Sequence, residues 1–290
     1  MVKQKKSLGT RIRNEWERFR RKAVGGIRNP GKAIRYEYSR LLQKFVLAGP
    51  LELQDLLIRH YNSHGMEFCV RHLRDRGYSP QTIVDCGAFI GGWTRMAKKE
   101  FPKARVIMIE PQEDKRQILA DLQKEFPGTV EFISCLLGPA SRDAVPFFEM
   151  ESGSSVLQEM TDHPRRPVTR QMRTVDEILS ERNIAGSVFL KMDVQGFEIE
   201  VLKGARQTLQ KTTMVVLEVA MLPFNQGAPI FHEVVQFMKE QGFVAYDICY
   251  AYRRGHDNVL NHVDIFFVPE NSPLRTTVAE KRVIVEVLKH

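Results

Sequence analysis

A glycine-rich segment directly follows a short apolar run and begins with an acidic residue. It is Asp85–Gly92, in which Gly87 and Gly91 have the spacing G-x-x-x-G. Glycine suits a place where a ligand approaches the backbone closely, but this spacing differs from the dinucleotide fingerprint G-x-G-x-x-G. Asp85 would repel a pyrophosphate and suits a cationic or hydroxyl-bearing ligand. An ordinary turn between a strand and a helix is the alternative interpretation.

A second acidic residue ends the next apolar run. Glu110 lies 25 positions after Asp85, and Pro111 follows it and stops the strand. In doubly wound sheets ligands bind beyond the carboxyl ends of the strands, where a carboxylate can accept hydrogen bonds from both ribose hydroxyls. The two acids together predict a nucleoside cofactor without a pyrophosphate, which points to S-adenosyl-L-methionine. The predicted cofactor-binding residues are Asp85, Gly87, Ala88, Gly91, Glu110 and Pro111.

Later strands also end in carboxylates. Asp193 and Glu218 follow apolar runs, and Glu198 lies in the first turn of an expected helix, so all three should gather near one edge of the sheet. Transfer of a methyl group to a hydroxyl requires that hydroxyl to lose its proton, which calls for a general base. Asp193 and Glu218 are the predicted catalytic residues, with Asp193 either the base or an anchor for the substrate. His232 and His262 are the secondary candidates for the base.

Two neighbouring features receive more modest interpretations. Lys191, two positions before Asp193, is expected to form an ion pair or to pack at the strand end. Asp193, Glu218 and His262 could together hold magnesium or zinc, but the sequence has no H-E-x-x-H motif and no close His/Asp spacing. We therefore predict no metal site.

Short apolar runs alternate with helical patterns through residues 66–270, which is typical of an α/β protein with a mostly parallel, doubly wound sheet. Expected strands are Thr82–Cys86, Arg105–Ile109, Val130–Cys135, Val188–Met192, Met214–Val219, Phe243–Tyr250 and His262–Val268. Expected helices are Trp93–Glu100, Asp114–Glu125, Glu198–Leu209 and Ile230–Gln241. Only a polar loop separates the last two strands, so we expect an antiparallel hairpin at the C-terminal end of the sheet.

Residues 66–270 resemble the FkbM-type family of S-adenosylmethionine-dependent methyltransferases. The resemblance rests on Asp85–Gly91, on Glu110–Pro111 and above all on the block from Lys191–Glu198 to Lys203–Ala205. It implies a seven-stranded Rossmann-like fold, O-methylation of a hydroxyl on a sugar or natural product, and Asp85, Gly87 and Glu110 at the cofactor. The sequence departs from the family at Phe89, where asparagine is usual, and at Gln195, where glutamate is usual.

Charge is concentrated in one part of the chain. The 290 residues include 43 Lys and Arg against 35 Asp and Glu, a net charge of +8. Residues 1–60 hold 15 of the basic and 5 of the acidic residues, net +10, so the remainder is net −2. This distribution argues against a nucleic-acid groove that runs through the whole fold. Four cysteines without a C-x-x-C pair indicate a reducing compartment.

We expect two parts, a basic amphipathic helical segment over residues 1–65 and a methyltransferase domain over residues 66–290. Ile12, Trp16, Phe19 and Ala23 fall on one helical face among arginines. This pattern suits packing on the enzyme, contact of residues 1–48 with an anionic membrane surface, or contact with RNA. No apolar run is long enough to span a bilayer, so we expect a cytoplasmic protein, peripheral at the inner membrane surface if the membrane contact holds.

Two other functional classes remain open from the sequence. One is a nucleic-acid methyltransferase that uses the basic N-terminus, although neither an Asn/Asp-Pro-Pro-aromatic motif nor a Pro-Cys nucleophile is present. The other is a non-catalytic protein that binds the cofactor or docks on a membrane. A small-molecule or glycan acceptor is the expected partner, and the oligomeric state is left open.

Overall fold

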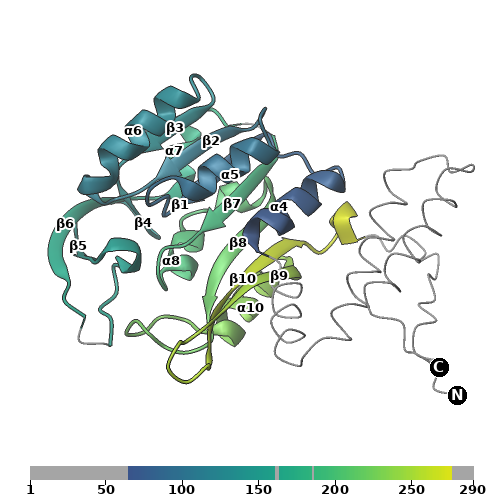
Figure 1. Cartoon of the computed structure of the whole chain (residues 1–290). Coiled ribbons are helices and arrows are strands. Elements are labelled where there is room, and N and C mark those ends of the chain that lie inside the picture. The colour runs from purple at the N-terminus through teal and green to yellow at the C-terminus, as the bar shows by residue number, and fades with distance from the viewer. Residues whose placement is uncertain (1–64, 161–162, 185, 276–290) are drawn as a thin grey trace, which may run out of the picture. The chain divides into compact units, whose positions relative to one another are not determined.

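The computed structural model describes residues 65–160, 163–184 and 186–275, so the helices expected within residues 1–65 lie outside the described residues. Its main feature is a seven-stranded sheet in the order β3-β2-β1-β7-β8-β10-β9 (Figure 1). The first five of these strands are parallel, whereas β10 is antiparallel to β8 and to β9. The strands are β1 (Thr82–Cys86), β2 (Arg105–Ile109), β3 (Val130–Ile133), β7 (Val188–Met192), β8 (Thr212–Ala220), β9 (Phe243–Arg253) and β10 (Leu260–Pro269). This topology confirms the predicted fold class and the C-terminal hairpin.

Helices cover both faces of the sheet (Figure 1). Successive side chains of a strand point to opposite faces, so in β1 Ile83 belongs to the core cluster that includes residues of α4, α5 and α6, while Val84 belongs to the cluster that includes residues of α7, α8 and α10. None of the helices among the described residues is long and apolar enough to cross a membrane. The helices are α4 (Met66–Asp75), α5 (Gly92–Glu100), η1 (Glu113–Lys115), α6 (Arg116–Glu125), η2 (Glu151–Gly153), α7 (Val175–Ser180), α8 (Glu198–Lys203), α9 (Arg206–Leu209), α10 (Phe231–Glu240) and η3 (Pro273–Arg275).

The helix expected over Glu198–Leu209 is interrupted and forms α8 and α9 instead. The break falls at Gly204, where a Cβ atom would collide with the carbonyl oxygen of Gly138. The side chain of Asp176 then accepts hydrogen bonds from the backbone of Gln207 (3.0 Å) and Thr208 (2.8 Å) and so satisfies the start of α9. Two tertiary contacts therefore end one helix and begin the next.

A second, three-stranded sheet in the order β4-β6-β5 is absent from the sequence-based prediction. It consists of β4 (Leu136–Leu137), β5 (Arg142–Glu149) and β6 (Arg166–Arg173), and it lies beside the large sheet (Figure 1). The segment between β5 and β6 contains η2 and several residues that line the cavities described below.

Candidate active site

The glycine loop after β1 touches the loop after β7, at the point where the strand order reverses. Gly87 has a positive φ of 75°, and a Cβ atom there would collide with the backbone oxygen of Asp193. Gly91 (φ 76°) directly precedes α5, and a Cβ there would collide with Leu122. The positive φ favours glycine at both positions, and at Gly87 the close approach of the Asp193 backbone also excludes a side chain. Phe89 also has a positive φ, 49°, which suits asparagine better than phenylalanine.

Asp85 lies beneath this loop and is fully buried. Its carboxylate accepts a hydrogen bond from the Thr94 hydroxyl (2.6 Å) and lies 3.1 Å from Nζ of Lys191. Lys191 also donates to the backbone oxygen of Gly87 (2.7 Å). Burial favours the neutral amine, but the carboxylates of Asp85 and Asp193 outweigh it and raise the pKa of Lys191. The ion pair expected for Lys191 is thus present, and it fixes the glycine loop from below.

Glu110 directly follows β2, as expected, and lines a first cavity of about 110 Å³. Its carboxylate accepts hydrogen bonds from the backbone of Phe89 (2.9 Å) and Gln112 (3.1 Å). Burial raises the pKa of Glu110, and these hydrogen bonds oppose the rise. The carboxylate therefore belongs to the same backbone cradle as the glycine loop.

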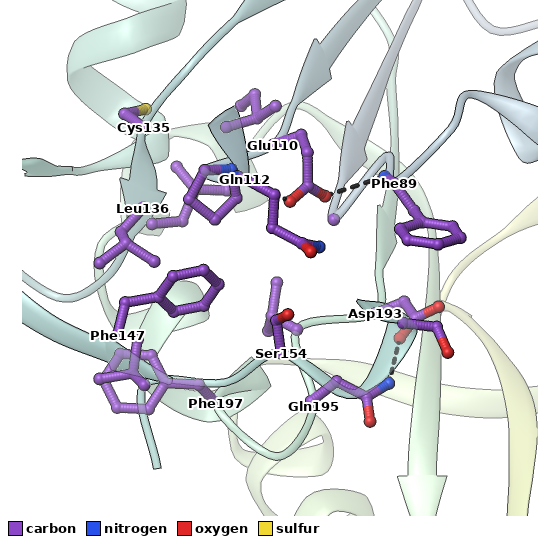
Figure 2. Close-up of a pocket in the computed structure, with 17 residues that line it drawn as sticks. Phe89, Glu110, Gln112, Cys135, Leu136, Phe147, Ser154, Asp193, Gln195 and Phe197 are labelled. Carbon is purple, nitrogen blue, oxygen red and sulfur yellow. Dashed lines mark hydrogen bonds between the residues drawn. The ribbon is translucent and has the colours of Figure 1, made fainter. Parts of the chain in front are cut away.

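The first cavity has one apolar and one polar side. Figure 2 shows Leu136, Phe147 and Phe197 together on one side, with Phe89, Asp193 and Gln195 across the opening. Such a cavity suits a flat base at its apolar side and hydroxyl groups near Glu110. Ser152 and Ser154 also line it, so the serine-rich segment between β5 and β6 forms part of the wall.

Asp193 lies where three cavities meet. It lines the first cavity, a second cavity of about 710 Å³ and a third of about 370 Å³. Gln195 donates from Nε2 to Oδ1 of Asp193 (2.7 Å) and to Oε1 of Glu218 (3.4 Å). A glutamate at position 195 would place a third carboxylate against two others, whereas the glutamine amide donates to both. The departure from the family at this position therefore fits its surroundings.

Carboxyl groups are concentrated around this meeting point. Burial raises the pKa of Glu198 to about 7, and burial together with the charge of Asp193 raises that of Asp264 to about 7. The pKa of Glu218 is also raised well above its ordinary value, by burial first and then by the carboxylates of Asp193, Glu198 and Asp264. Lys191 opposes the rise at Glu218 and Asp264. A further cationic group here would favour the ionised carboxylates.

The second cavity is the largest of the three and has polar walls. It shares Ser152, Asp193 and Gln195 with the first cavity. His262 lies in its wall, with Nε2 3.8 Å from Oε2 of Glu218 and its ring stacked on Tyr252 at 5.0 Å between ring centroids. Burial lowers the pKa of His262. Other polar residues of this wall are Glu159, Arg165, Glu198, Asn225, Arg254 and Asn261.

The third cavity also borders the glycine loop and has none of the apolar residues Leu136, Phe147 and Phe197 in its wall. Gly87, Phe89 and Asp193 line both cavities, and Glu218 and Asp264 line the third. Ligand groups could therefore pass over the glycine loop from one cavity to the other while remaining next to Asp193.

The predicted site residues divide into those that line a cavity and those that support it. Gly87, Glu110, Pro111 and Asp193 line the first cavity, Glu218 lines the second and third, and Ala88 lines the third. Asp85 and Gly91 line none of these cavities and act through packing beneath and beside the loop. His232 is exposed on α10 and lines none of them either. Within the described ranges, no three His, Cys, Asp or Glu residues are grouped so that they could hold a metal ion.

Several residues of the site have no counterpart in the sequence-based prediction. Phe147, Asn225 and Asp264 reach the cavities from β5, the loop after β8 and β10. Asp264 pairs with Glu218 across β10 and β8, and alternation along the last strand was the one signal that could have placed it on the same face. Asn225 is held by a hydrogen bond from its amide to the backbone oxygen of Gln195 (2.7 Å), a contact between distant segments that no local pattern indicates.

Comparison with known proteins agrees with this geometry. Residues 85–245, more than half of the chain, match the Methyltransferase FkbM domain. The chain is 26% identical over 198 residues to the hexuronic acid methyltransferase AglP of Haloferax volcanii, covering 68% of this chain and 77% of that protein.

Solved methyltransferase structures are also similar. The methyltransferase FkbM of Methylobacillus flagellatus KT aligns with a TM-score of 0.41 and 17% identity over 65% of this chain, which spans only 44% of that chain's length. Magnesium protoporphyrin IX methyltransferase (ChlM) from Synechocystis PCC 6803, solved with bound SAM, aligns with a TM-score of 0.38 and 10% identity over 92% of this chain and 100% of that chain. The domain match confirms the resemblance: the chain belongs to the FkbM methyltransferase family and is an S-adenosylmethionine-dependent enzyme.

Proposed function

We propose that the enzyme methylates a hydroxyl group of a sugar or glycan acceptor that binds in the second cavity. The observation that carries this proposal is that Asp193 and Gln195 line both the first and the second cavity. A methyl group presented from one cavity and a hydroxyl presented from the other would meet beside the Asp193 carboxylate.

The residues of the first and third cavities suit the cofactor. Glu110 would accept hydrogen bonds from the ribose hydroxyls, and Leu136, Phe147 and Phe197 would pack against the adenine. The methionine part would pass over Gly87 into the third cavity, whose carboxyl groups favour a positively charged ligand. When bound, S-adenosylmethionine supplies a methyl group activated by its sulfonium.

Asp193 is the group we assign to the acceptor hydroxyl. Its side chain is 39% exposed, and Oδ2 lies 3.8 Å from Nζ of Lys191, with which it forms an ion pair. Glu218 is less exposed, and burial together with the neighbouring carboxylates raises its pKa, so we assign it contact with the acceptor rather than removal of the proton. Asp193 orients the acceptor hydroxyl and takes its proton. Gln195 donates hydrogen bonds to both Asp193 and Glu218 and so fixes the distance between these two carboxyl groups.

The curated relative supports a sugar acceptor, because its name describes methylation of a hexuronic acid. The wall of the second cavity supports it as well. Tyr252 and His262 line this cavity and stack with their ring centroids 5.0 Å apart, and such flat amphipathic surfaces suit the apolar faces of sugar rings.

The experiment compares Asp193→Asn with Asp121→Asn, a matched substitution at an exposed residue of α6. Transfer of radiolabelled methyl groups to a panel of neutral and acidic glycosides is measured together with the cofactor dissociation constant. We expect Asp193→Asn to lower kcat by about 10²–10⁴-fold with little change in cofactor affinity, and Asp121→Asn to behave as the parent enzyme. Wild-type turnover in Asp193→Asn would end the assignment.

The product also tests whether the acceptor group is a hydroxyl. A methyl ether survives mild alkali, whereas a methyl ester formed on a carboxylate is hydrolysed. An alkali-labile product, or the absence of transfer to every sugar tested, would contradict the proposed reaction.

For the N-terminal part we propose, from the sequence alone, that residues 1–65 are separate from the catalytic domain and that residues 1–48 contact an anionic membrane surface, with the enzyme at the cytoplasmic face. The support is the +10 charge of residues 1–60. The full chain should float with liposomes that contain anionic lipid and should dissociate as salt is raised. Flotation that is equal with neutral liposomes would argue against it.

A further inference from the structure

One arginine in the wall of the second cavity has buried nitrogen atoms without partners. The side chain of Arg165, just before β6, is only 9% exposed, and its Nη2 forms an ion pair with Glu159, which is 11% exposed. Nε and Nη1 of the same guanidinium are buried and have no hydrogen-bond partner among the described residues. Arg165 lines the second cavity.

Two amide oxygens in the same wall share this property. Oδ1 of Asn225 and Oδ1 of Asn261 are buried without a hydrogen-bond partner in the described part of the chain. The orientation of each amide follows from its nitrogen: Asn225 donates to the backbone of Gln195 (2.7 Å), and Nδ2 of Asn261 lies 3.3 Å from Nδ1 of His262. The cavity therefore presents buried donors from one residue and buried acceptors from two others.

A buried donor or acceptor that is left unpaired carries a large desolvation penalty, so a ligand that pairs with it binds strongly. A guanidinium has donors only, and its strongest partners are carboxylate and phosphate oxygens. The oxygen atoms of Asn225 and Asn261 can only accept, and sugar hydroxyls can donate to them. A ligand that satisfies all three residues carries both an anionic oxygen and hydroxyl groups.

We propose that Arg165 determines acceptor specificity by binding a carboxylate of the acceptor, which is therefore a sugar acid. Asn225 and Asn261 accept hydrogen bonds from its hydroxyls, and Arg165 holds the carboxylate while a different oxygen of the sugar meets Asp193. This inference rests on the proposed function, because the proposed function places the acceptor in the second cavity.

The test measures binding and needs no turnover. D-glucuronate, D-glucose and D-glucose 6-phosphate are each titrated calorimetrically into the full chain saturated with S-adenosylhomocysteine. Because hydrogen bonds to charged groups are the strong ones, we expect glucuronate to bind about 10- to 100-fold more tightly than glucose. We expect Arg165→Met to remove this preference and Arg165→Lys to retain part of it.

Arg166→Met is the matched control. It removes the same charge one position away, from a side chain that is 70% exposed and does not line the cavity, and it should keep the preference for glucuronate. An unchanged affinity for S-adenosylhomocysteine shows that Arg165→Met is folded. If Arg165→Met fails to fold, the test rests on Arg165→Lys. A reduced preference for glucuronate over glucose in Arg165→Lys supports the proposal, and an unchanged preference overturns it.

Equal binding of glucuronate and glucose by the parent enzyme, or a preference that survives in Arg165→Met, would overturn the proposal. Tighter binding of glucose 6-phosphate than of glucuronate would overturn the assignment to a carboxylate. The proposed reaction can fail separately from the proposed role of Arg165. Selective binding of glucuronate without methyl transfer would contradict the reaction alone. Methyl transfer to neutral and acidic sugars alike would contradict the role of Arg165 alone.

Discussion

Replacing Lys191 by methionine is expected to destabilise the fold and to weaken cofactor binding together. The ammonium of Lys191 contacts the Asp85 carboxylate (3.1 Å), the backbone oxygen of Gly87 (2.7 Å) and the Asp193 carboxylate (3.8 Å). It thereby joins the strand beneath the glycine loop, the loop itself and the predicted catalytic carboxylate. Methionine has a similar length and fills the same space without charge.

The magnitude follows from the burial of Asp85. Its carboxylate is fully buried, and once Lys191 is gone the Thr94 hydroxyl (2.6 Å) is the remaining side-chain partner. Removal of one partner of a buried ion pair costs about 3–5 kcal/mol, because the other charge is left uncompensated. The double variant Lys191→Met/Asp85→Asn has no buried charge at this place, so it should recover most of the free energy of unfolding.

The assay is urea unfolding of the full chain, combined with calorimetric titration of S-adenosylmethionine. Lys203→Met is the matched control, since Lys203 is exposed on α8 and pairs with Glu200 at the surface, where an ion pair contributes about 0–1 kcal/mol. The reasoning is refuted if Lys191→Met lies within about 1 kcal/mol of the parent enzyme, or if the double variant is no more stable than the single one. If the double variant regains stability but not cofactor affinity, the contact between Lys191 and the backbone of Gly87 is responsible for the affinity.

Two further predictions concern individual carboxyl groups. The amides of Phe89 and Gln112 donate to different oxygens of the Glu110 carboxylate, so Glu110→Gln keeps an acceptor for only one of them and also loses the charge. The dissociation constant of the cofactor, measured by calorimetry, should therefore rise about tenfold; an unchanged value would exclude Glu110 from the cofactor site. Glu198 has a pKa raised from 4.5 to about 7, so its contribution to stability is complete below about pH 4.5 and is lost as the pH rises through about 7. In urea unfolding, the loss of stability between about pH 5 and 8 should be smaller by about 2–3 kcal/mol in Glu198→Gln than in the parent enzyme, and an identical pH dependence in the two proteins would contradict this.

The sequence-based prediction was most accurate where a strand is buried on both faces. β1, β2 and β7 begin and end at the predicted residues, because strands covered on both faces are mainly apolar runs and each of these runs is followed by a glycine or an acidic residue, namely Gly87, Glu110 and Asp193. The small sheet escaped prediction for the opposite reason. Half of the residues of β5 and half of those of β6 are exposed, and β6 contains three arginines, so neither has the continuous apolar run of a buried strand.

The same contrast applies to the site. Glu110 and Asp193 were predictable because parallel strands bring their carboxyl ends to one edge, and an acid directly after a strand must lie there. Arg165 and Asn225 reach the cavity from connections between strands, through long-range packing that has no local sequence period. Asp85 shows the limit of motif reading, since its position next to the glycines is compatible both with a ligand contact and with the buried ion pair that the structure has.

The loops after β1 and β7 touch each other, and this contact gives Gly87 and Lys191 a role in the rate of methyl transfer. The backbone of Asp193 donates to the oxygen of Cys86 (3.1 Å), and Gly87 lies so close to Asp193 that no side chain fits between them. Lys191 binds both loops at once. The loop that we propose holds the cofactor therefore cannot shift without moving the carboxylate assigned to the acceptor. Methyl transfer depends on the alignment of nucleophile, methyl group and leaving sulfur, and small misplacements cost large factors in rate. A rigid joint between the two loops keeps that alignment, which is why residues that touch neither ligand belong to the working site.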